Sequence, residues 1–501
     1  MEHERSSKAA PRTGIFRTKS VEQSIRDTDD PDTKLRKELT SWDLTVFGVA
    51  VVIGAGIFTL TARTAGNVAG PSVSLAFVLA AVACGLAALC YAEFASTVPV
   101  AGSAYTFSYA TFGEFIAWII GWDLVLEFAL AASVVAKGWS LYLGEVLGAS
   151  SPVVTIGSID VDWGAFLIVV IITVLLASGT KLSSRVSLVI TAIKVAVVLL
   201  VVVVGAFYIK AENYTPYIPS AQEGSTGEGI HQSLFSFFTG AGGSTFGWYG
   251  LLAAASLVFF AFIGFDVVAT TAEEAKEPQK ALPRGILGSL AIVTVLYVAV
   301  TLVLTGMVNY TELGGDSSTL ATAFELNGLT WAKNVISFGA LAGLTTVVMV
   351  LMLGQTRVLF AMSRDGLMPR SLAHTGKRGT PVRITLIVGV VVAALAAFFP
   401  IGLLEEMVNI GTLFAFVLVS IGVVVLRKTR PGLPRGFKVP LMPLIPVLAV
   451  VSCLWLMVNL SVETWLRFIA WMAIGVLVYF VYSKRNVEKL LLERDKSTTR
   501  E

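Results

Sequence analysis

Charged residues are scarce in this chain of 501 residues, of which Asp, Glu, Lys and Arg make up 14%. An average soluble domain carries about 25% of these residues. The mean hydropathy of +0.78 is also far too high for a soluble protein of this size. The composition therefore predicts an integral membrane protein.

Cysteine and histidine are rare as well, with three residues of each. Cys84, Cys90 and Cys453 all fall in apolar runs, which excludes a disulfide framework and a paired metal-ligand spacing. The histidines lie in the N-terminal tail or in loops, which argues against a histidine relay inside the membrane. The sequence also lacks a GxxxxGK[ST] phosphate loop and an HExxH motif, so ATP-driven transport and zinc proteolysis are excluded. We expect no cofactor, no metal and no nucleic-acid partner.

Long apolar runs, in contrast, are abundant. A helix of about 20 apolar residues crosses the ~30 Å of hydrocarbon in a bilayer. Twelve such spans are predicted, at 44–65, 72–96, 115–143, 163–178, 186–209, 248–272, 286–308, 331–356, 384–400, 403–426, 442–459 and 464–483. The chain is therefore predicted to be an all-α protein of twelve transmembrane helices.

The basic residues predict the orientation, because Lys and Arg are enriched in cytoplasmic loops. With both termini inside, all but six of the 37 basic residues fall in cytoplasmic segments. The six are Arg63, Lys137, Lys194, Lys210, Lys333 and Arg467. Residues 1–42 have mixed charge and no apolar core, so we expect a cytoplasmic tail and no signal peptide.

Two glycine-containing stretches interrupt apolar spans near their centres. VVIGAGIFTL (51–60) lies ~15–20 Å into span 1 at 1.5 Å per residue, and FFAFIGFD (259–266) interrupts span 6. A single glycine often only allows close helix packing. Two interruptions five spans apart, in helices that enter from opposite sides, are typical of an inverted-repeat transporter with its site between the repeats. We therefore predict a substrate site at these breaks.

Four stretches also carry a resemblance to a known family. They are VVIGAGIF (51–58), ALCYAEFASTVPVAGSAYTFSYATFGEFIAWIIGWDLVLEF (88–128), FFAFIGFDVVATTAEEAKEPQKALPRGI (259–286) and QTRVLFAMSRDGLMP (355–369). They resemble the amino acid-polyamine-organocation permeases, and among these most closely the cationic amino acid transporters and their bacterial proton-coupled relatives. The resemblance implies a LeuT-like 5+5 inverted repeat with broken helices 1 and 6, plus two extra C-terminal helices.

On this plan the tail 1–42 precedes a first repeat at 43–209, an extracellular loop at 210–247 and a second repeat at 248–426. Two further helices at 427–483 and a cytoplasmic tail at 484–501 complete the chain. The resemblance implies uptake of L-amino acids across the plasma membrane, as in bacterial cells, by proton symport and alternating access. The expected partners are a free amino acid, a proton and lipid, whereas an accessory subunit or a homo-oligomer is left open.

The two breaks would hold the two charged ends of an amino acid. Freed amides at the start of a half-helix attract an α-carboxylate, and freed carbonyls accept hydrogen bonds from an α-ammonium group. The predicted carboxylate amides are those of Ala55, Gly56 and Ile57. The predicted ammonium acceptors are the carbonyls of Ile53, Phe260, Ala261 and Ile263. By resemblance, Phe260 would also be an aromatic lid over the substrate, with ordinary packing as the alternative.

Charged residues inside a span are costly and by default functional. Lys194 lies ~12 Å into span 5 and is the predicted proton-coupling residue. Alternatively, its side chain reaches back to the membrane interface. By resemblance, its proton would replace the Na⁺ of sodium-coupled relatives. Glu127 lies at midplane depth in span 3, one helical turn after Asp123, and is predicted to influence the choice of substrate side chain. Lys137 is expected to be an interfacial anchor.

Other charges gather where spans 6 and 8 meet the cytoplasm. They are Glu273, Glu274, Lys276, Lys280 and Arg284 after span 6, and Arg364 with Asp365 after span 8. These residues form either inner-gate ion pairs or solvated loop charges. Glu93 and Arg357 are predicted to have no special role.

A secondary transporter is the predicted function. A channel would need a symmetric ring of carbonyls or like charges, and two non-equivalent breaks argue against one. An intramembrane enzyme would need a catalytic pair, for which only Asp123 and Asp266 are available, and IGFD is not the usual setting. The substrate is predicted to be a cationic amino acid such as arginine or lysine, or alternatively a small neutral one such as alanine. Exchange is an alternative to symport.

Overall fold

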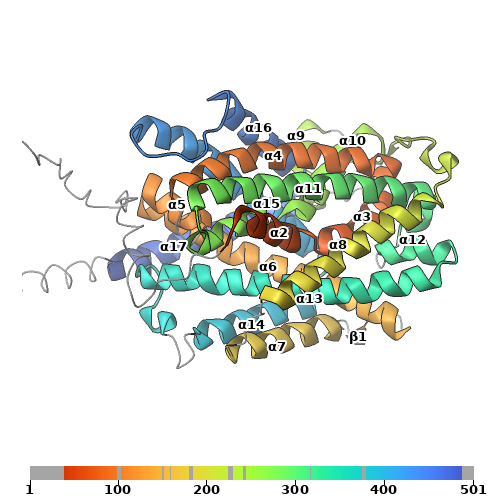
Figure 1. The fold of residues 1–501 in the computed structure, drawn as a ribbon, viewed down its shortest axis with the longest axis horizontal. Coiled ribbons are helices and arrows are strands. Elements are labelled where there is room, and N and C mark those ends of the chain that lie inside the picture. The colour runs from red at the N-terminus through yellow and green to blue at the C-terminus, as the bar shows by residue number, and fades with distance from the viewer. Residues whose placement is uncertain are drawn as a thin grey trace, which may run out of the picture.

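The computed structural model describes residues 39–98, 103–148, 152–157, 159–179, 184–223, 229–240, 244–315, 318–374 and 380–487. The predicted cytoplasmic tails lie largely outside these ranges. Most helices run along one long axis and form an elongated bundle (Figure 1). Eight helical runs in the described ranges are long and apolar enough to cross a membrane. The chain is therefore a multi-pass membrane protein.

The eight runs are Ser41–Thr97, Glu114–Leu147 (α6), Leu188–Ala206 (most of α8, Ser184–Ala206), Gly247–Ala269, Pro278–Met307 (α11), Thr330–Arg364 (α13), Ile401–Thr429 (α15) and Val462–Val487, which contains α17 (Val462–Val478). Three shorter apolar helices are α7 (Trp163–Ala177), α14 (Val382–Phe398) and α16 (Leu444–Val458). The first run contains two of the predicted spans. Each of the twelve predicted apolar runs thus overlaps a helix of the structure.

Span 1 is interrupted where the sequence predicts it. Its first half, α2 (Ser41–Val52), begins at a capping box in which Thr40 and Asp43 each bond the other's backbone N–H. The helix ends at Ile53, which has extended backbone (φ −69°, ψ 91°). The path resumes at Ala55 and continues through η1 (Gly56–Leu60), α3 (Thr61–Thr64), η2 (Ala65–Ala69) and η3 (Gly70–Ser72) into α4 (Val73–Thr97).

Span 6 is interrupted as well. Its first half, α10 (Gly247–Val258), tightens into the 3₁₀ turn η6 (Phe259–Phe262). Ile263 is extended (ψ 138°) and Gly264 has φ +118°, a value that favours glycine because a side chain would be strained there. The chain then continues as η7 (Phe265–Glu274).

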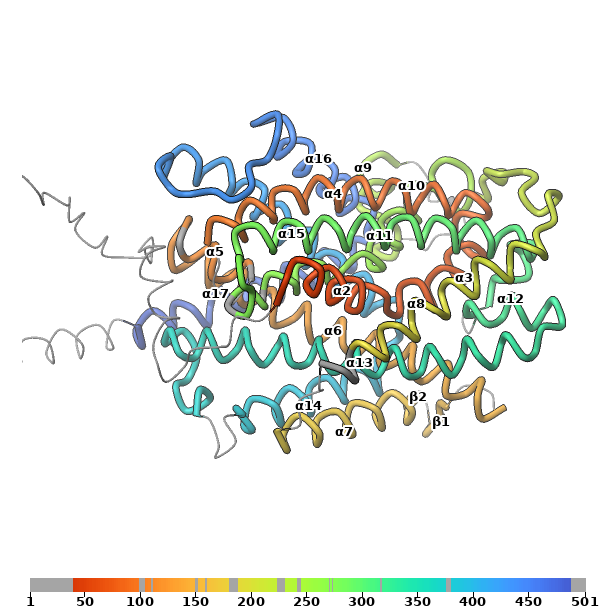
Figure 2. The backbone as a smooth tube through the Cα atoms, viewed as in Figure 1, coloured from red at the N-terminus to blue at the C-terminus, as the bar shows by residue number. Residues whose placement is uncertain are grey.

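The longest helices, α6 and α13, pack against each other in the middle of the bundle. On one side of them lie α7 and α14, and on the other side α11 packs against α2 and α4 (Figure 2). Helix α15 contacts both α6 and α4. This packing places both interruptions inside the bundle, where buried apolar side chains surround them.

Short elements that the apolar pattern does not predict occupy the connections. They are α5 (Ser103–Thr111), the hairpin β1 (Val153–Ile156) and β2 (Ile159–Asp162), η4 (Ala211–Tyr214), η5 (Gly229–His231), α9 (Leu234–Thr239), the pair β3 (Gln222–Glu223) and β4 (Ser244–Thr245), η8 (Tyr310–Leu313), α12 (Leu320–Leu326) and η9 (Arg370–Ala373). The turn η10 (Tyr479–Ser483) continues α17 within the last predicted span.

Candidate substrate site between the interrupted helices

A small cavity lies where the two interrupted helices meet. Residues from spans 1, 3, 6 and 8 form its wall: Val51, Val52, Gly54, Ala55, Gly56, Ala131, Val135, Phe260, Ile263, Val347 and Leu351. All of these residues are apolar, so the polar groups of the wall are backbone groups. The cavity measures about 20 Å³, which is room for about one water molecule. An amino acid therefore fits only after the surrounding helices move apart.

Four of the predicted substrate residues line this cavity, namely Ala55, Gly56, Phe260 and Ile263. Ala55 and Gly56 begin the second half of span 1, where helix amides have no acceptor within the helix. The carbonyl of Phe260 already accepts a hydrogen bond from the Ile263 amide at 3.1 Å. Ile53, Ile57, Ala261 and Glu127 do not belong to the wall, and their roles remain predictions.

The two breaks are in direct contact. A Cβ added at Gly56 would lie 2.3 Å from the Cα of Ala261 and 2.5 Å from its Cβ. Only glycine allows this approach, because non-bonded carbons prefer to be ~3.5–4.0 Å apart. The breaks of spans 1 and 6 therefore lie side by side, with Gly56 packed against Ala261.

Lys194 on α8 is buried and lies at the end of α2. Its Nζ donates hydrogen bonds to the carbonyls of Ala50 at 2.6 Å and Ile53 at 3.3 Å. The ammonium group thus lies against the negative end of a half-helix dipole and does not reach back to the interface. The Ile53 carbonyl, which was predicted to bind the substrate ammonium, is already engaged by this lysine.

Two further side chains cap the half-helices. Tyr297 on α11 donates from Oη to the Val52 carbonyl at 2.7 Å. Asn409 on α15 donates from Nδ2 to the carbonyls of Ser256 at 2.9 Å and Leu257 at 3.3 Å, near the end of α10. Neither residue is recognisable as a cap from the sequence alone. The available signal was a polar side chain inside an apolar span, but nothing in the sequence identifies the distant carbonyls that they bind.

Glu127 lies outside the cavity wall, in a buried group of carboxyl side chains. It lies close enough to Asp266 and Asp123 to interact electrostatically with both. Among the described residues, no Lys or Arg forms an ion pair with Asp123, Glu127 or Asp266. The described His, Cys, Asp and Glu side chains also form no cluster that could hold a metal ion. The structure therefore places these carboxyl groups together without a basic partner.

Ion pairs link the helices on either side of the site. Arg63 on α3 pairs with the buried Glu405 on α15. Arg357 on α13 pairs with Glu274 at the end of η7, with 3.7 Å between Nη2 and Oε1. Arg357, which is predicted to have no special role, thus has an ion-pair partner that its sequence position does not reveal, because Glu274 is far away in the sequence. Of the other proposed inner-gate residues, Lys280 pairs with Glu277, three positions earlier, and the Glu273 side chain lies outside the described residues.

Glu93 is also more than a surface charge. It is buried, and it accepts hydrogen bonds from Arg427 Nε at 2.7 Å, Arg427 Nη2 at 2.5 Å and the Val439 amide at 2.7 Å. Glu93 thus ties α4 to the segment that follows α15.

Two further predicted charges also have partners. Asp365 accepts a hydrogen bond from Tyr105 Oη at 2.8 Å. Lys137 pairs with Asp162, the last residue of β2, with 3.3 Å between Nζ and Oδ2.

A multi-pass bundle in which two interrupted helices meet at a small cavity is the architecture of a membrane transporter. Comparison with known families matches residues 39–484 to the amino acid permeases. The chain belongs to this family. The resemblance to the amino acid-polyamine-organocation permeases and to the cationic amino acid transporters is thereby confirmed.

Similar proteins cover nearly the whole chain. It is 44% identical to the branched-chain amino acid permease BcaP of Bacillus subtilis (strain 168), over 94% of this chain and 98% of that protein. It is 41% identical to the methylthioribose transporter of the same organism, over 95% and 99%. It is 36% identical to the vacuolar cationic amino acid transporter 4 of Arabidopsis thaliana, over 84% and 68%. All three relatives are named as permeases or transporters.

Proposed function

We propose that this permease takes up neutral aliphatic amino acids, and branched-chain ones best, by proton symport with alternating access. The apolar cavity wall carries the proposal. Burial contributes ~0.8 kcal/mol per CH₂ group, so a leucine side chain gains more from this wall than an alanine side chain. An arginine or lysine head group would lose water there without finding a charged partner. The name of the Bacillus subtilis branched-chain permease supports the same substrate class.

The backbone at the breaks supplies the polar contacts in this proposal. The α-carboxylate binds the amides of Ala55, Gly56 and Ile57, at the positive end of the second half of span 1. The α-ammonium binds carbonyls of the span 6 break. The wall positions of Phe260 and Ile263 support this assignment, and Phe260 then covers the substrate.

Lys194 carries the coupling proton in the proposal. Its charge-assisted hydrogen bonds to Ala50 and Ile53 hold span 5 against span 1. A neutral lysine makes weaker bonds there, so loss of the proton favours separation of the two spans. The equilibrium between the open and closed forms then depends on whether the proton is bound. No other cofactor enters the mechanism.

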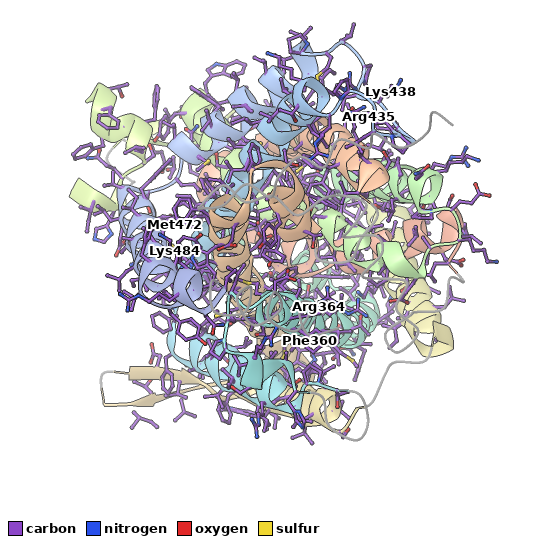
Figure 3. All side chains as sticks on the ribbon, turned by 90° about the vertical axis from the view of Figure 1, so that its left-hand side faces the viewer. Phe360, Arg364, Arg435, Lys438, Met472 and Lys484 are labelled. Carbon is purple, nitrogen blue, oxygen red and sulfur yellow. The ribbon has the colours of Figure 1, made fainter. Side chains whose placement is uncertain are left out.

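We also propose twelve membrane spans in a LeuT-like 5+5 inverted repeat, with both termini cytoplasmic in a bacterial cell membrane. Two equivalent contacts support the repeat. Lys194 of span 5 caps the first half of span 1, and Asn409 of span 10 caps the first half of span 6. Arg364, Arg435, Lys438 and Lys484 lie toward the same end of the bundle (Figure 3), which supports a cytoplasmic position of that end.

A cationic substrate is the second candidate. The observation that favours it is the group of buried carboxyl side chains at Asp123, Glu127 and Asp266. A long basic side chain that passes the apolar wall would find negative charge there. The similarity to a cationic amino acid transporter points the same way.

Purified protein in liposomes tests both candidates. Uptake of labelled leucine, alanine and arginine is measured with and without an inward proton gradient, with empty liposomes and a protonophore as controls. We expect gradient-dependent accumulation of leucine above alanine, and none of arginine. Accumulation of arginine alone would refute the neutral substrate class. Leucine uptake that requires internal leucine and does not depend on the proton gradient would indicate exchange and not symport.

A further inference from the structure

Tyr297 binds the backbone at the break in span 1 without lining the cavity. Its side chain is fully buried on α11, and its Oη donates to the Val52 carbonyl at 2.7 Å. Val52 belongs to the cavity wall, whereas Tyr297 does not. The hydroxyl group of Tyr297 therefore binds the last residue of α2, immediately before the extended residue Ile53.

The ring of Tyr297 reaches the other break. Its centroid lies 5.4 Å from that of Phe262, in the 3₁₀ turn where span 6 unwinds. It also lies 5.8 Å from Phe77 on α4, and the two phenylalanine rings are 6.0 Å apart. These separations are typical of packed aromatic rings. Tyr297 thus contacts span 1 through its hydroxyl group and span 6 through its ring.

The Val52 carbonyl is one of the orphan carbonyls at the end of a half-helix, where the helix dipole is negative. Bare carbonyls at this point would repel a carboxylate that approaches the adjacent amides. Lys194 covers the carbonyls of Ala50 and Ile53, and Tyr297 covers that of Val52. The three bonds together leave the amide side of the break as the attractive surface for an anion.

We propose that Tyr297 is a positioning residue for substrate binding: it fixes the backbone at Val52, where span 1 breaks, and aligns it with the span 6 break. The inference rests on the proposed amino acid site and adds to it a determinant in span 7 that does not touch the substrate. A buried tyrosine commonly satisfies its hydroxyl group in a protein core. The difference here is that its backbone partner, Val52, lines the cavity.

Tyr142 provides a matched control. It is fully buried on α6, and its Oη donates to the Phe58 carbonyl at 2.7 Å, also in span 1. Phe58 lies in the second half of the span and is not part of the cavity wall. Tyr142→Phe therefore removes a similar bond from the same span, away from the break.

The test compares Tyr297→Phe with Tyr142→Phe in liposomes. We expect Tyr297→Phe to raise the KM for leucine about tenfold, the typical effect of one unsatisfied buried acceptor, and to leave the dependence on the proton gradient unchanged. Tyr142→Phe should keep the wild-type KM, while both variants lose similar thermal stability in detergent. A wild-type KM in Tyr297→Phe, or an equal rise in both variants, would overturn the proposal.

Hydrogen exchange without substrate gives a second, independent readout. Mass spectrometry of overlapping peptides should show faster exchange at residues 54–56 in Tyr297→Phe and no change at these residues in Tyr142→Phe. If the wild-type protein transports no amino acid, the proposed function fails, yet this measurement still decides the role of Tyr297. Unchanged exchange at residues 54–56 in Tyr297→Phe would show that the tyrosine does not hold the break.

Discussion

Gly56→Ala is the sharpest perturbation that the structure offers, because it adds one methyl group between the two breaks. The new Cβ would lie 2.3 Å from the Ala261 Cα and 3.0 Å from its backbone N. Carbon atoms prefer at least ~3.5 Å, so the two segments have to separate by ~1.2 Å. The atoms that must yield are backbone atoms of span 6, which cannot move aside as the end of a flexible side chain would.

Overpacking of this kind costs ~1–3 kcal/mol. If this strain falls on the substrate-bound form, in which both breaks contact the amino acid, the affinity drops roughly 5- to 150-fold. We therefore expect Gly56→Ala to insert and purify normally but to show a KM for leucine that is raised by about this factor in liposome uptake.

Gly85→Ala is the control, because a Cβ at Gly85 on α4 meets no atom within 4 Å. This variant should transport like the wild type. A wild-type KM for Gly56→Ala would show that the breaks do not need to be in contact for substrate binding. Failure of both variants would point to a general effect of the substitution on folding.

Three further predictions concern coupling, specificity and topology. Lys194→Met should retain leucine exchange between the two sides of the liposome but lose accumulation driven by a proton gradient. Accumulation at the wild-type level would show that another group carries the proton, with Glu127 the first candidate. Glu127→Gln should leave the leucine KM unchanged, because the Glu127 carboxyl group lies outside the cavity wall. A selective loss of arginine uptake would instead support the cationic candidate. An equal loss of leucine and arginine uptake would indicate a structural or proton-linked role. A cysteine at Ser225, in the predicted extracellular loop and outside the described residues, should react with an impermeant thiol reagent added to intact cells, and protection would reverse the proposed orientation.

The local features of this fold could be read from the sequence, because they depend on neighbouring residues. Apolar runs long enough to cross a bilayer predict helices, and all twelve overlap helices of the structure. Glycines in the centres of two such runs predict the breaks near Ile53 and Ile263, where the structure shows extended backbone. A lysine deep in span 5 predicts a functional charge, and its ammonium group lies at the span 1 break.

The contacts that join distant segments could not be predicted. Tyr297 and its acceptor Val52 are 245 positions apart, and Arg427 and Glu93 are 334 positions apart. No spacing rule connects such pairs, since their proximity depends on how the helices pack and not on local periodicity. The same limit explains why Glu127, at the expected depth in span 3, could not be placed relative to the cavity wall.

The small size of the cavity also affects how binding measurements should be interpreted. A substrate binds only the fraction of molecules that have opened, so the apparent dissociation constant equals the intrinsic constant divided by that fraction. The Arg63–Glu405 pair joins α3 to α15 without lining the cavity, and its loss would change the open fraction. Substitutions at such a pair can therefore strengthen or weaken the measured affinity of every substrate by the same factor. A uniform change of this kind is the signature of a residue that sets the conformational equilibrium, whereas a residue of the wall changes the ranking of substrates.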